Sequence, residues 1–484
     1  MTTIKLDPGA ALLLDALHGA GHAAYAVGGC VRDSLLGLDP HDWDLCTSAR
    51  PEQVMALFGE EKCIPTGLQH GTVTVKQGGR LYETTTFRTE GAYSDGRHPD
   101  AVCFVPDVRE DLARRDFTIN AMAYSAEEGL IDPFGGRDDL AAHLVRAVGE
   151  PERRFEEDAL RILRLYRFAA RFGFAIDPAT GAAARALGPH LDCVSAERIQ
   201  EELLKLLAAP RPGSYLEPAV LAVILPELEP EKQPERFAEL CRTIDRIEPT
   251  AENVPARLAA LLCPLGEAGA RKALRKLKCS NALTDEVTAL EREAGGDAGS
   301  FLLGHEFELR HPADALCLER HSHPAGRCPN SNSLFPPQAA VVAVAGHSIA
   351  RPIACGNRVP PQWTVLGETP GTPNTTLTVQ AKRLLGRYEL PTIQRLTALC
   401  SARHPEQAEA FAALRAEAEQ LTAENACCRV SQLAVNGRDL MAAGVRPGPG
   451  LRQVLNALLE AVITGQTPNE KDVLLAAAAR FSAS

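Results

Sequence analysis

Two aspartates separated by one residue, Asp42 and Asp44, are the side chains in this sequence best suited to hold a metal ion. The segment Asp42–Leu45 is typical of a short β-strand, in which residues two apart point to the same face. Two carboxylates on one face repel each other unless a cation lies between them, and Mg²⁺ prefers such hard oxygen ligands. The spacing therefore predicts a magnesium site, although a solvated turn is the commoner meaning of Asp-x-Asp. Glu83, in the β-rich run 81–87, is a candidate third carboxylate or a solvent-facing strand residue.

A glycine pair precedes these carboxylates. Gly28 and Gly29 stand between the expected strand 23–27 and the expected helix 31–36. Without side chains there, the backbone can approach a phosphate closely, and Arg32 in the first helical turn is placed to bind a triphosphate oxygen. A Gly-Gly turn alone is more often only a turn. A phosphate-binding turn followed by a carboxylate pair on the next strand is what metal-assisted phosphoryl transfer requires.

A third motif, residues 114–121, begins with adjacent arginines and continues into an apolar segment. Arg115 is a candidate to contact phosphate or ribose, Asp116 to hold an arginine in place, and Asn120 to bond a sugar hydroxyl. The alternative is a solvated charged turn that leads into a packed segment.

The fourth motif lies in a segment, 157–171, that has helical spacing of its apolar residues. Asp158, Arg161 and Arg164 are three residues apart and share one helix face, and Arg167 follows. A carboxylate beside a guanidinium complements cytosine and adenine, which both offer an amino donor next to a ring-nitrogen acceptor, and it rejects uracil and guanine. The hypothesis is base selection without a template. The alternative is an amphipathic helix with a surface ion pair.

The elements that must position these residues change along the 484-residue chain. Residues 1–136 read as a mixed α/β head. From 137 the pattern turns helical, and we divide it into a neck (137–208), a body (209–319) and a tail (379–484). Residues 320–378 are rich in Pro, Gly, Asn and Ser and read as an irregular insertion with one strand at 339–345.

Composition excludes several classes of protein. The 62 acidic and 51 basic side chains give a net charge of −11, so any nucleic-acid contact must come from local arginines. No apolar run of membrane-spanning length occurs, and the N-terminus lacks the apolar stretch of a signal peptide. The 14 cysteines form no Cys-x-x-Cys pair, which favours reduced thiols in the cytoplasm. A zinc site at 317–328, from Cys317, His321, His323 and Cys328, has no standard spacing and is the weaker interpretation.

Taken together, the four motifs resemble those of the class II tRNA nucleotidyltransferases, which include CCA-adding enzymes and bacterial poly(A) polymerases. The segments that carry the resemblance stand in the same order over about residues 20–205: Gly28–Asp33, Asp42–Asp44, Arg114–Ala121 and Glu157–Arg161. The segments 435–440 and 444–449 resemble the family's C-terminal region. The resemblance implies an α+β chain with a polymerase-beta-like nucleotidyltransferase head followed by an all-helical neck, body and tail.

It also implies roles for single residues. Asp42 and Asp44 would be the catalytic metal ligands, with Mg²⁺ as the cofactor. The nucleotide would be held by the following side chains and glycines: Gly28, Gly29, Arg32, Arg115, Asn120, Asp158, Arg161, Arg164 and Arg167. The implied partners are ATP, CTP and the tRNA 3′ end, with no membrane and no obligate protein partner.

Within the family, the segment 67–75 and the long loop 88–99 favour addition of C, C and A. An A-adding or CC-adding enzyme or a poly(A) polymerase remains the alternative, and a non-catalytic RNA-binding protein is a further one. Some members carry a His-Asp phosphohydrolase motif, but the comparable stretch here is Leu261–Pro264, so we expect no such activity.

Overall fold

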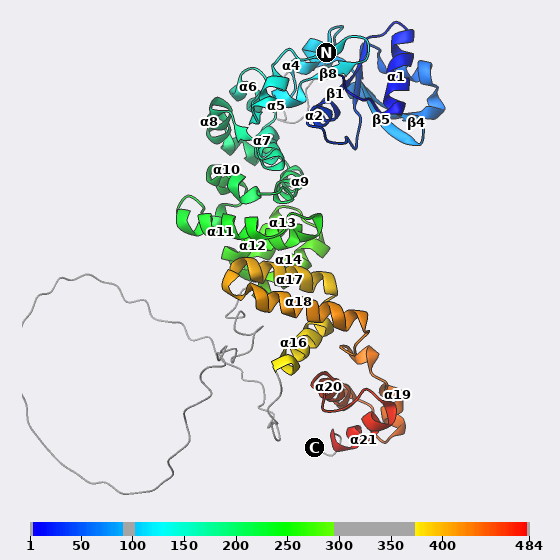
Figure 1. Ribbon diagram of the computed structural model, residues 1–484, viewed down its shortest axis with the longest axis vertical. Helices are drawn as coiled ribbons and strands as arrows, with labels where there is room; N and C mark the ends of the chain where they lie inside the picture. The colour runs from blue at the N-terminus through cyan, green and yellow to red at the C-terminus, as the bar shows by residue number, and fades with distance from the viewer. Residues whose placement is uncertain (1–2, 91–101, 295–372, 482–484) are drawn as a thin grey trace, which may run out of the picture.

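The computed structural model describes residues 3–90, 102–294 and 373–481. The chain is elongated, with a sheet-containing head at one end and helices that follow in chain order toward the C-terminus at the other (Figure 1). The expectation of an α+β head followed by helices is confirmed. Three predicted features lie outside the described residues: the strand at 339–345, the zinc candidates at 317–328, and residues 91–99 of the long loop 88–99.

The head is built on a seven-stranded mixed sheet in the order β3-β4-β5-β2-β1-β8-β9. Strand β2 lies in the middle of the sheet, antiparallel to β1 and parallel to β5. Residues from both neighbouring strands can therefore lie next to the N-terminal end of β2. The strands are β1 Ala24–Val27, β2 Leu45–Thr47, β3 Cys63–Gly67, β4 Thr72–Gln77, β5 Arg80–Thr86, β8 Ala123–Ser125 and β9 Gly129–Ile131. Smaller pairs are formed by β6 Arg88–Glu90 with β7 Val102–Phe104 and by β10 Leu144–Val145 with β11 Ala175–Ile176.

The strand expected at Asp42–Leu45 begins only at Leu45, so the two aspartates lie in the segment just before β2. Charged aspartates are poor strand residues, which explains the later start. The segment is still held against the sheet, because the Val27 amide donates to the Asp44 carbonyl at 3.0 Å. Trp43 is buried whereas Asp42 and Asp44 are exposed, so the two carboxylates do share one face.

The head's helices are α1 Pro8–Gly19, α2 Gly29–Leu35, α3 Pro51–Phe58, α4 Val108–Ala113 and α5 Gly136–Ala141, with the short 3-10 turn η3 Thr118–Asn120. The helical part continues with α6 Pro151–Glu157, α7 Leu160–Phe172, α8 Pro178–Ala186, α9 Ala196–Leu207, α10 Pro218–Ile224, α11 Pro234–Arg246, α12 Val254–Leu262, α13 Gly266–Lys276 and α14 Asn281–Ala294. After the undescribed segment follow α16 Pro373–Arg387, α17 Leu390–Arg403, α18 Ala408–Ala423, the 3-10 turn η10 Val430–Gln432, α19 Gly437–Ala442, α20 Pro449–Ile463 and α21 Lys471–Phe481.

Two expected boundaries are wrong. The single helix expected over 157–171 is two helices, because Asp158 has an extended backbone (φ −148°, ψ 102°) and its side chain accepts a hydrogen bond from the Leu160 amide at 3.0 Å. Aspartate commonly competes with a helix in this way. Helix α16 begins at Pro373, within the segment 320–378 that was expected to be irregular. Proline is well tolerated at the start of a helix, and the Asn and Thr residues that follow it hid the helical pattern.

A fully buried arginine ties the helices beyond the head together. The Arg257 guanidinium on α12 donates to the carbonyls of Leu207 at 2.7 Å, Ala209 at 2.5 Å and Ile247 at 2.5 Å. These carbonyls lie at or just after the C-terminal ends of α9 and α11, where backbone acceptors lack helical partners. One side chain therefore fixes α9 relative to α11 and α12. Among the described residues, no helix is long and apolar enough to cross a bilayer.

Glu291 on α14 gives a test of the packing of this region. Its side chain is 2% exposed, neither carboxylate oxygen has a hydrogen-bond partner among the described residues, and burial raises its pKa from 4.5 to about 7 despite the field of Arg403. The folded state therefore holds a proton between pH 4.5 and 7 that the unfolded chain releases, so stability must fall as pH rises through that interval.

We predict that Glu291→Gln removes most of this pH dependence, which amounts to about 3 kcal/mol of unfolding free energy. Thermal unfolding of both proteins at pH 5 and pH 8 measures it, with the exposed Glu409→Gln on α18 as control. Equal pH dependence in wild type and Glu291→Gln would show that this carboxyl does not titrate in the fold.

Candidate active site

The carboxylates of Asp42, Asp44 and Glu83 lie near the N-terminal end of β2. The parallel register pairs Leu45 with Thr84, so one residue earlier Asp44 lies beside Glu83 on the same face. Asp44 reaches solvent, yet the dense protein around it, and then the charges of Glu83 and Asp42, raise its pKa, whereas Arg115 lowers it. Mutual repulsion among three acidic groups is the electrostatic pattern that a bound cation relieves.

These residues fit a divalent metal in their donor chemistry. Asp42 and Asp44 offer hard carboxylate oxygens on an open surface. Within the described ranges, no three His, Cys, Asp or Glu side chains lie together closely enough to enclose an ion by themselves. The arrangement suits a cation that takes its remaining ligands from water and from the phosphates of a substrate, as Mg²⁺ does.

The glycine turn next to the carboxylates is shaped around an arginine. Gly28 has φ +78° and ψ −123°, a conformation available almost only to glycine. A β-carbon at Gly28 would also lie 2.9 Å from Nη1 of Arg115, so the guanidinium rests directly on the backbone of the turn. Arg115 is held loosely by Asp111 at 3.4 Å, and its Nε has no partner among the described residues. The predicted neighbours Gly28, Arg115 and Asp44 therefore do come together.

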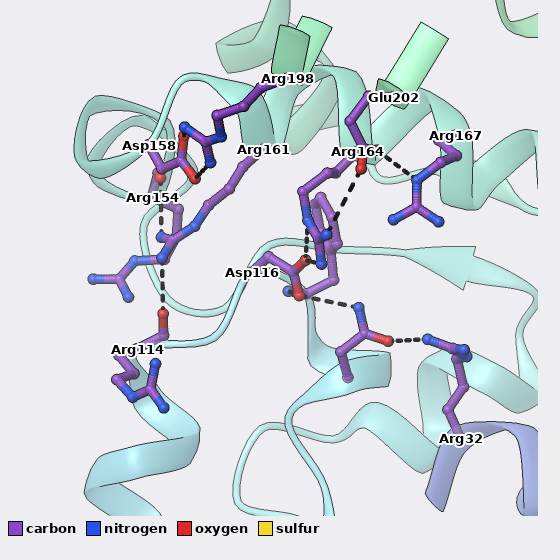
Figure 2. A network of polar contacts seen from close by, with 12 residues as sticks. Arg32, Arg114, Asp116, Arg154, Asp158, Arg161, Arg164, Arg167, Arg198 and Glu202 are labelled. Carbon is purple, nitrogen blue, oxygen red and sulfur yellow. Dashed lines mark hydrogen bonds and ion pairs between the residues drawn. The ribbon is translucent and has the colours of Figure 1, made fainter. Parts of the chain in front are cut away.

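A continuous line of hydrogen bonds runs from this turn into the helical part (Figure 2). Arg32 on α2 donates to the Asn120 side chain, and Asn120 Nδ2 donates to Asp116 Oδ1 at 3.0 Å. Asp116 Oδ2 accepts from Nε and Nη2 of Arg164 on α7, at 2.9 and 2.6 Å. Burial would raise the pKa of Asp116, but the charge of Arg164 and these hydrogen bonds hold it well below its usual range. The expectation that Asp116 holds an arginine in place is confirmed.

Two side chains in this hydrogen-bonded line, Arg32 and Asn120, were predicted to contact the nucleotide but bind other residues of the protein. Arg32 is 4% exposed and is also bound by Asp33 at 2.7 Å, so it is directed into the head and not toward an open phosphate site. Asn120 is buried, with its amide between Arg32 and Asp116. Their predicted contacts with triphosphate and sugar stay predictions.

Four arginines are stacked on two phenylalanine rings of α7. Arg167 lies 4.0 Å and Arg32 5.2 Å from the centre of the Phe168 ring. Arg164 adjoins the same ring, and Arg32 and Arg171 adjoin the Phe172 ring. Cations over aromatic faces are attracted by the ring and shielded from water. The rings therefore allow a dense positive cluster to exist at the junction of α2 and α7.

Asp158 and Arg161 do not form the side-by-side pair that a single helix would give. Asp158 lies in the break between α6 and α7 and is bound by both terminal nitrogens of Arg198, at 2.8 and 3.3 Å. Arg161, on α7, is buried and binds Glu157 at 2.8 Å and the carbonyls of Arg154 and Arg114 at 3.1 Å. The break separates the two side chains and gives each its own partner (Figure 2).

Two residues of α9 were missed by sequence reasoning. Arg198 holds Asp158, and Glu202 holds Arg167 at 2.5 Å with Arg164 at 4.0 Å. Glu202 is 5% exposed and lies on the buried face with Ile199 and Leu203. A glutamate at an apolar position of a helix was the available signal, because such a charge requires a buried partner.

Comparison with known proteins identifies the family. Residues 24–146 match the poly A polymerase head domain, and residues 386–478 match tRNA nucleotidyltransferase domain 2. Residues 173–232 match the RNA and SrmB-binding site of polymerase A. The CCA-adding enzyme of Lactiplantibacillus plantarum is 32% identical over 465 residues, which cover 96% of this chain and 93% of that protein. The chain belongs to the CCA-adding enzyme family.

Two further members of the family also match this chain. The CCA-adding enzyme of Leuconostoc citreum is 45% identical over 257 residues, and the aligned chain spans 63% of that protein's length. The crystal structure of the Bacillus stearothermophilus CCA-adding enzyme in complex with CTP is 30% identical, with a TM-score of 0.68 over 98% of both chains. The resemblance drawn from the four motifs is therefore confirmed for the whole chain.

The Gly28 turn provides a structural test of the site. We predict that Gly28→Ala destabilises the head by about 1–3 kcal/mol, because alanine is strained at this φ and its methyl group collides with Arg115. Scanning calorimetry should show a lower unfolding temperature for the variant. Gly19→Ala, with an ordinary backbone and free space around it, is the matched control and should leave the temperature nearly unchanged. A Gly28→Ala protein as stable as this control would contradict the described turn.

Proposed function

We propose that this protein is a template-independent tRNA nucleotidyltransferase that adds C, C and A to the 3′ end of tRNA, using CTP and ATP and releasing pyrophosphate. The observation that carries the proposal is the meeting of Asp44, Glu83 and Arg115 beside the Gly28 turn, in a chain that matches a CCA-adding enzyme over 96% of its length. A protein that only bound RNA would gain nothing from carboxylates that repel one another.

The substrates follow from the site's chemistry and the relatives. The Bacillus stearothermophilus enzyme is seen in complex with CTP, and we extend that ligand to this chain. Arg115, lying on the Gly28 backbone, would meet the triphosphate. The described cysteines are all free thiols, which suits our placement of the enzyme in the reducing cytoplasm, where tRNA is matured.

The reaction joins one nucleotide at a time. The 3′-hydroxyl oxygen of the RNA attacks the α-phosphorus of the nucleotide, the bond from that phosphorus to the bridging oxygen breaks, and pyrophosphate leaves as the hydroxyl proton is released. Asp42 and Asp44 would hold Mg²⁺, with Glu83 beside them as a supporting catalytic carboxylate. When bound, this ion supplies charge neutralisation for the phosphates and makes the hydroxyl a better nucleophile. Arg115 adds positive charge close to Asp44.

We propose that Asp158 and Arg161 read the base. Asp158 would accept the exocyclic amine of cytosine or adenine while Arg161 donates to the ring nitrogen. Arg198 binds Asp158 and Glu157 binds Arg161, and each ion pair limits the rotation of the side chain that would contact the base. Arg164 and Arg167 support this arrangement through Asp116 and Glu202. Residues 137–208 would then act as the neck for nucleotide selection, 209–319 as the body, and 379–484 as the tail that binds tRNA.

The catalytic role of the carboxylates is tested with Asp44→Asn. We predict a loss on the order of a thousandfold in the rate of CTP incorporation into tRNA that ends at its discriminator base, because a neutral amide holds a divalent cation poorly. Asp15→Asn, an exposed change on α1 of the same head, is the control. Near-normal incorporation by Asp44→Asn would remove this carboxylate from the mechanism.

Base selection is tested with Asp158→Ala. We predict that CTP and ATP incorporation weakens by about 1–3 kcal/mol, since Arg198 then lacks its partner and the base amine lacks its acceptor. The preference for CTP and ATP over UTP and GTP should also become smaller, because the Asp158 carboxylate no longer repels the carbonyl group of uracil or guanine. All four nucleotides are compared on one tRNA, with the exposed Glu156→Ala as control. An unchanged preference for C and A would place selection elsewhere.

A further inference from the structure

A second polar network joins α5 of the head to α8 of the helical part. Its centre is Arg146, whose guanidinium binds two buried carboxylates. Nε of Arg146 lies 3.2 and 3.3 Å from the carboxylate oxygens of Asp139 on α5, and Nη1 lies 2.9 Å from Asp177, the residue just before α8. An arginine shared between two acidic groups fixes both of them in place. No step of the proposed reaction uses these three side chains.

Asp139 extends this network into the third sequence motif. Its Oδ2 accepts a hydrogen bond from Oγ1 of Thr118 at 2.7 Å, and both side chains are buried. A hydroxyl bound to a buried carboxylate is a strong and directional contact. Thr118 opens the turn η3 and stands two residues from Asp116 and two from Asn120, which hold arginines of α7 and α2. Asp139 therefore contacts the motif that links the head to the helical part.

The backbone of the motif is supported at the same place. The Thr118 amide donates to the Arg146 carbonyl at 2.9 Å, and the Val148 amide donates to the Asp116 carbonyl at 3.1 Å. Gly136, the first residue of α5, packs directly on the motif, since a β-carbon there would lie 2.2 Å from the Thr118 carbonyl oxygen. The course of residues 116–118 is thus set by neighbours to which the proposed reaction gives no role.

We propose that Asp139 is a positioning residue for the nucleotide site and acts through Thr118; this rests on the function proposed above. Arg115 lies three residues before Thr118, and its guanidinium rests on the Gly28 backbone close to Asp44. By holding the Thr118 hydroxyl, Asp139 fixes the segment from which Arg115 reaches that turn. A misplacement of about 1 Å at a reacting centre can slow the chemistry about a hundredfold. A contact outside the site therefore helps to set the rate within it.

Two substitutions remove the contact from either end. Thr118→Val keeps the shape of the side chain without its hydroxyl, and Asp139→Ala removes the acceptor. We expect each to lower the maximal single-turnover rate of CMP incorporation into tRNA about tenfold, because the reactive geometry is reached less often. The CTP concentration for half-maximal rate should change less than about threefold, because the nucleotide keeps its own contacts. Thr118→Ser, which restores the hydroxyl, should recover the rate, and the exposed Asp138→Ala on α5 is the control.

The double variant and a second measurement separate positioning from general damage. In Thr118→Val combined with Asp139→Ala, the rate should fall no further than in the slower single variant, because the two changes remove the same bond. Hydrogen exchange gives a readout that needs no reaction. The amides of Thr118, Asn120 and Ala121, all hydrogen-bonded in the structure, should exchange at least about fivefold faster in Thr118→Val than in Asp138→Ala.

The outcomes distinguish this proposal from the function on which it rests. A wild-type protein that does not extend tRNA would overturn the proposed function, and the exchange measurement would then decide by itself whether Asp139 holds the motif. The positioning role is overturned by a wild-type rate in folded Thr118→Val, by a Thr118→Ser protein as slow as Thr118→Val, by multiplied losses in the double variant, or by unchanged exchange. The Thr118 variants decide the matter if Asp139→Ala does not fold.

Discussion

The hydrogen-bonded line from Arg32 through Asn120 and Asp116 to Arg164 is the interaction on which the arrangement of the site depends. It crosses from α2 of the head to α7 of the helical part, and Arg32, Asn120 and Asp116 are buried while Arg164 is partly exposed. A buried charge that loses its partner costs several kcal/mol, so each member constrains the next. The head and the first helices beyond it are therefore held in one relative position.

That constraint explains why so many arginines can gather at the junction of α2 and α7. Phe168 and Phe172 provide flat apolar faces for the guanidinium groups, while Asp116 and Glu202 neutralise part of their charge. The arginines at the junction of α2 and α7 and the carboxylates at the N-terminal end of β2 are therefore two separate groups of opposite charge.

The sequence predicted a mixed α/β head followed by helices because the spacing of apolar residues is a local feature, and the resemblance carried by the four motifs implied the fold class. The alternation of Asp42, Trp43 and Asp44 was enough to place two carboxylates on one face, even though β2 begins only at Leu45. Local spacing failed at Asp158, where a side-chain hydrogen bond to Leu160 ends one helix and begins another. It could not reveal Arg198 and Glu202, because their partners lie 35 to 40 residues away in the chain and meet them only in the folded protein.

Whether one site adds C, C and A in order without a template is measured by extending a tRNA that ends at its discriminator base. The full chain is incubated with CTP alone, with ATP alone and with both, and the products are separated at single-nucleotide resolution. Ordered addition at one site predicts two added residues with CTP alone, none with ATP alone, and three with both. Repeated addition of A, a halt after two C residues in the presence of ATP, or no extension at all would contradict it.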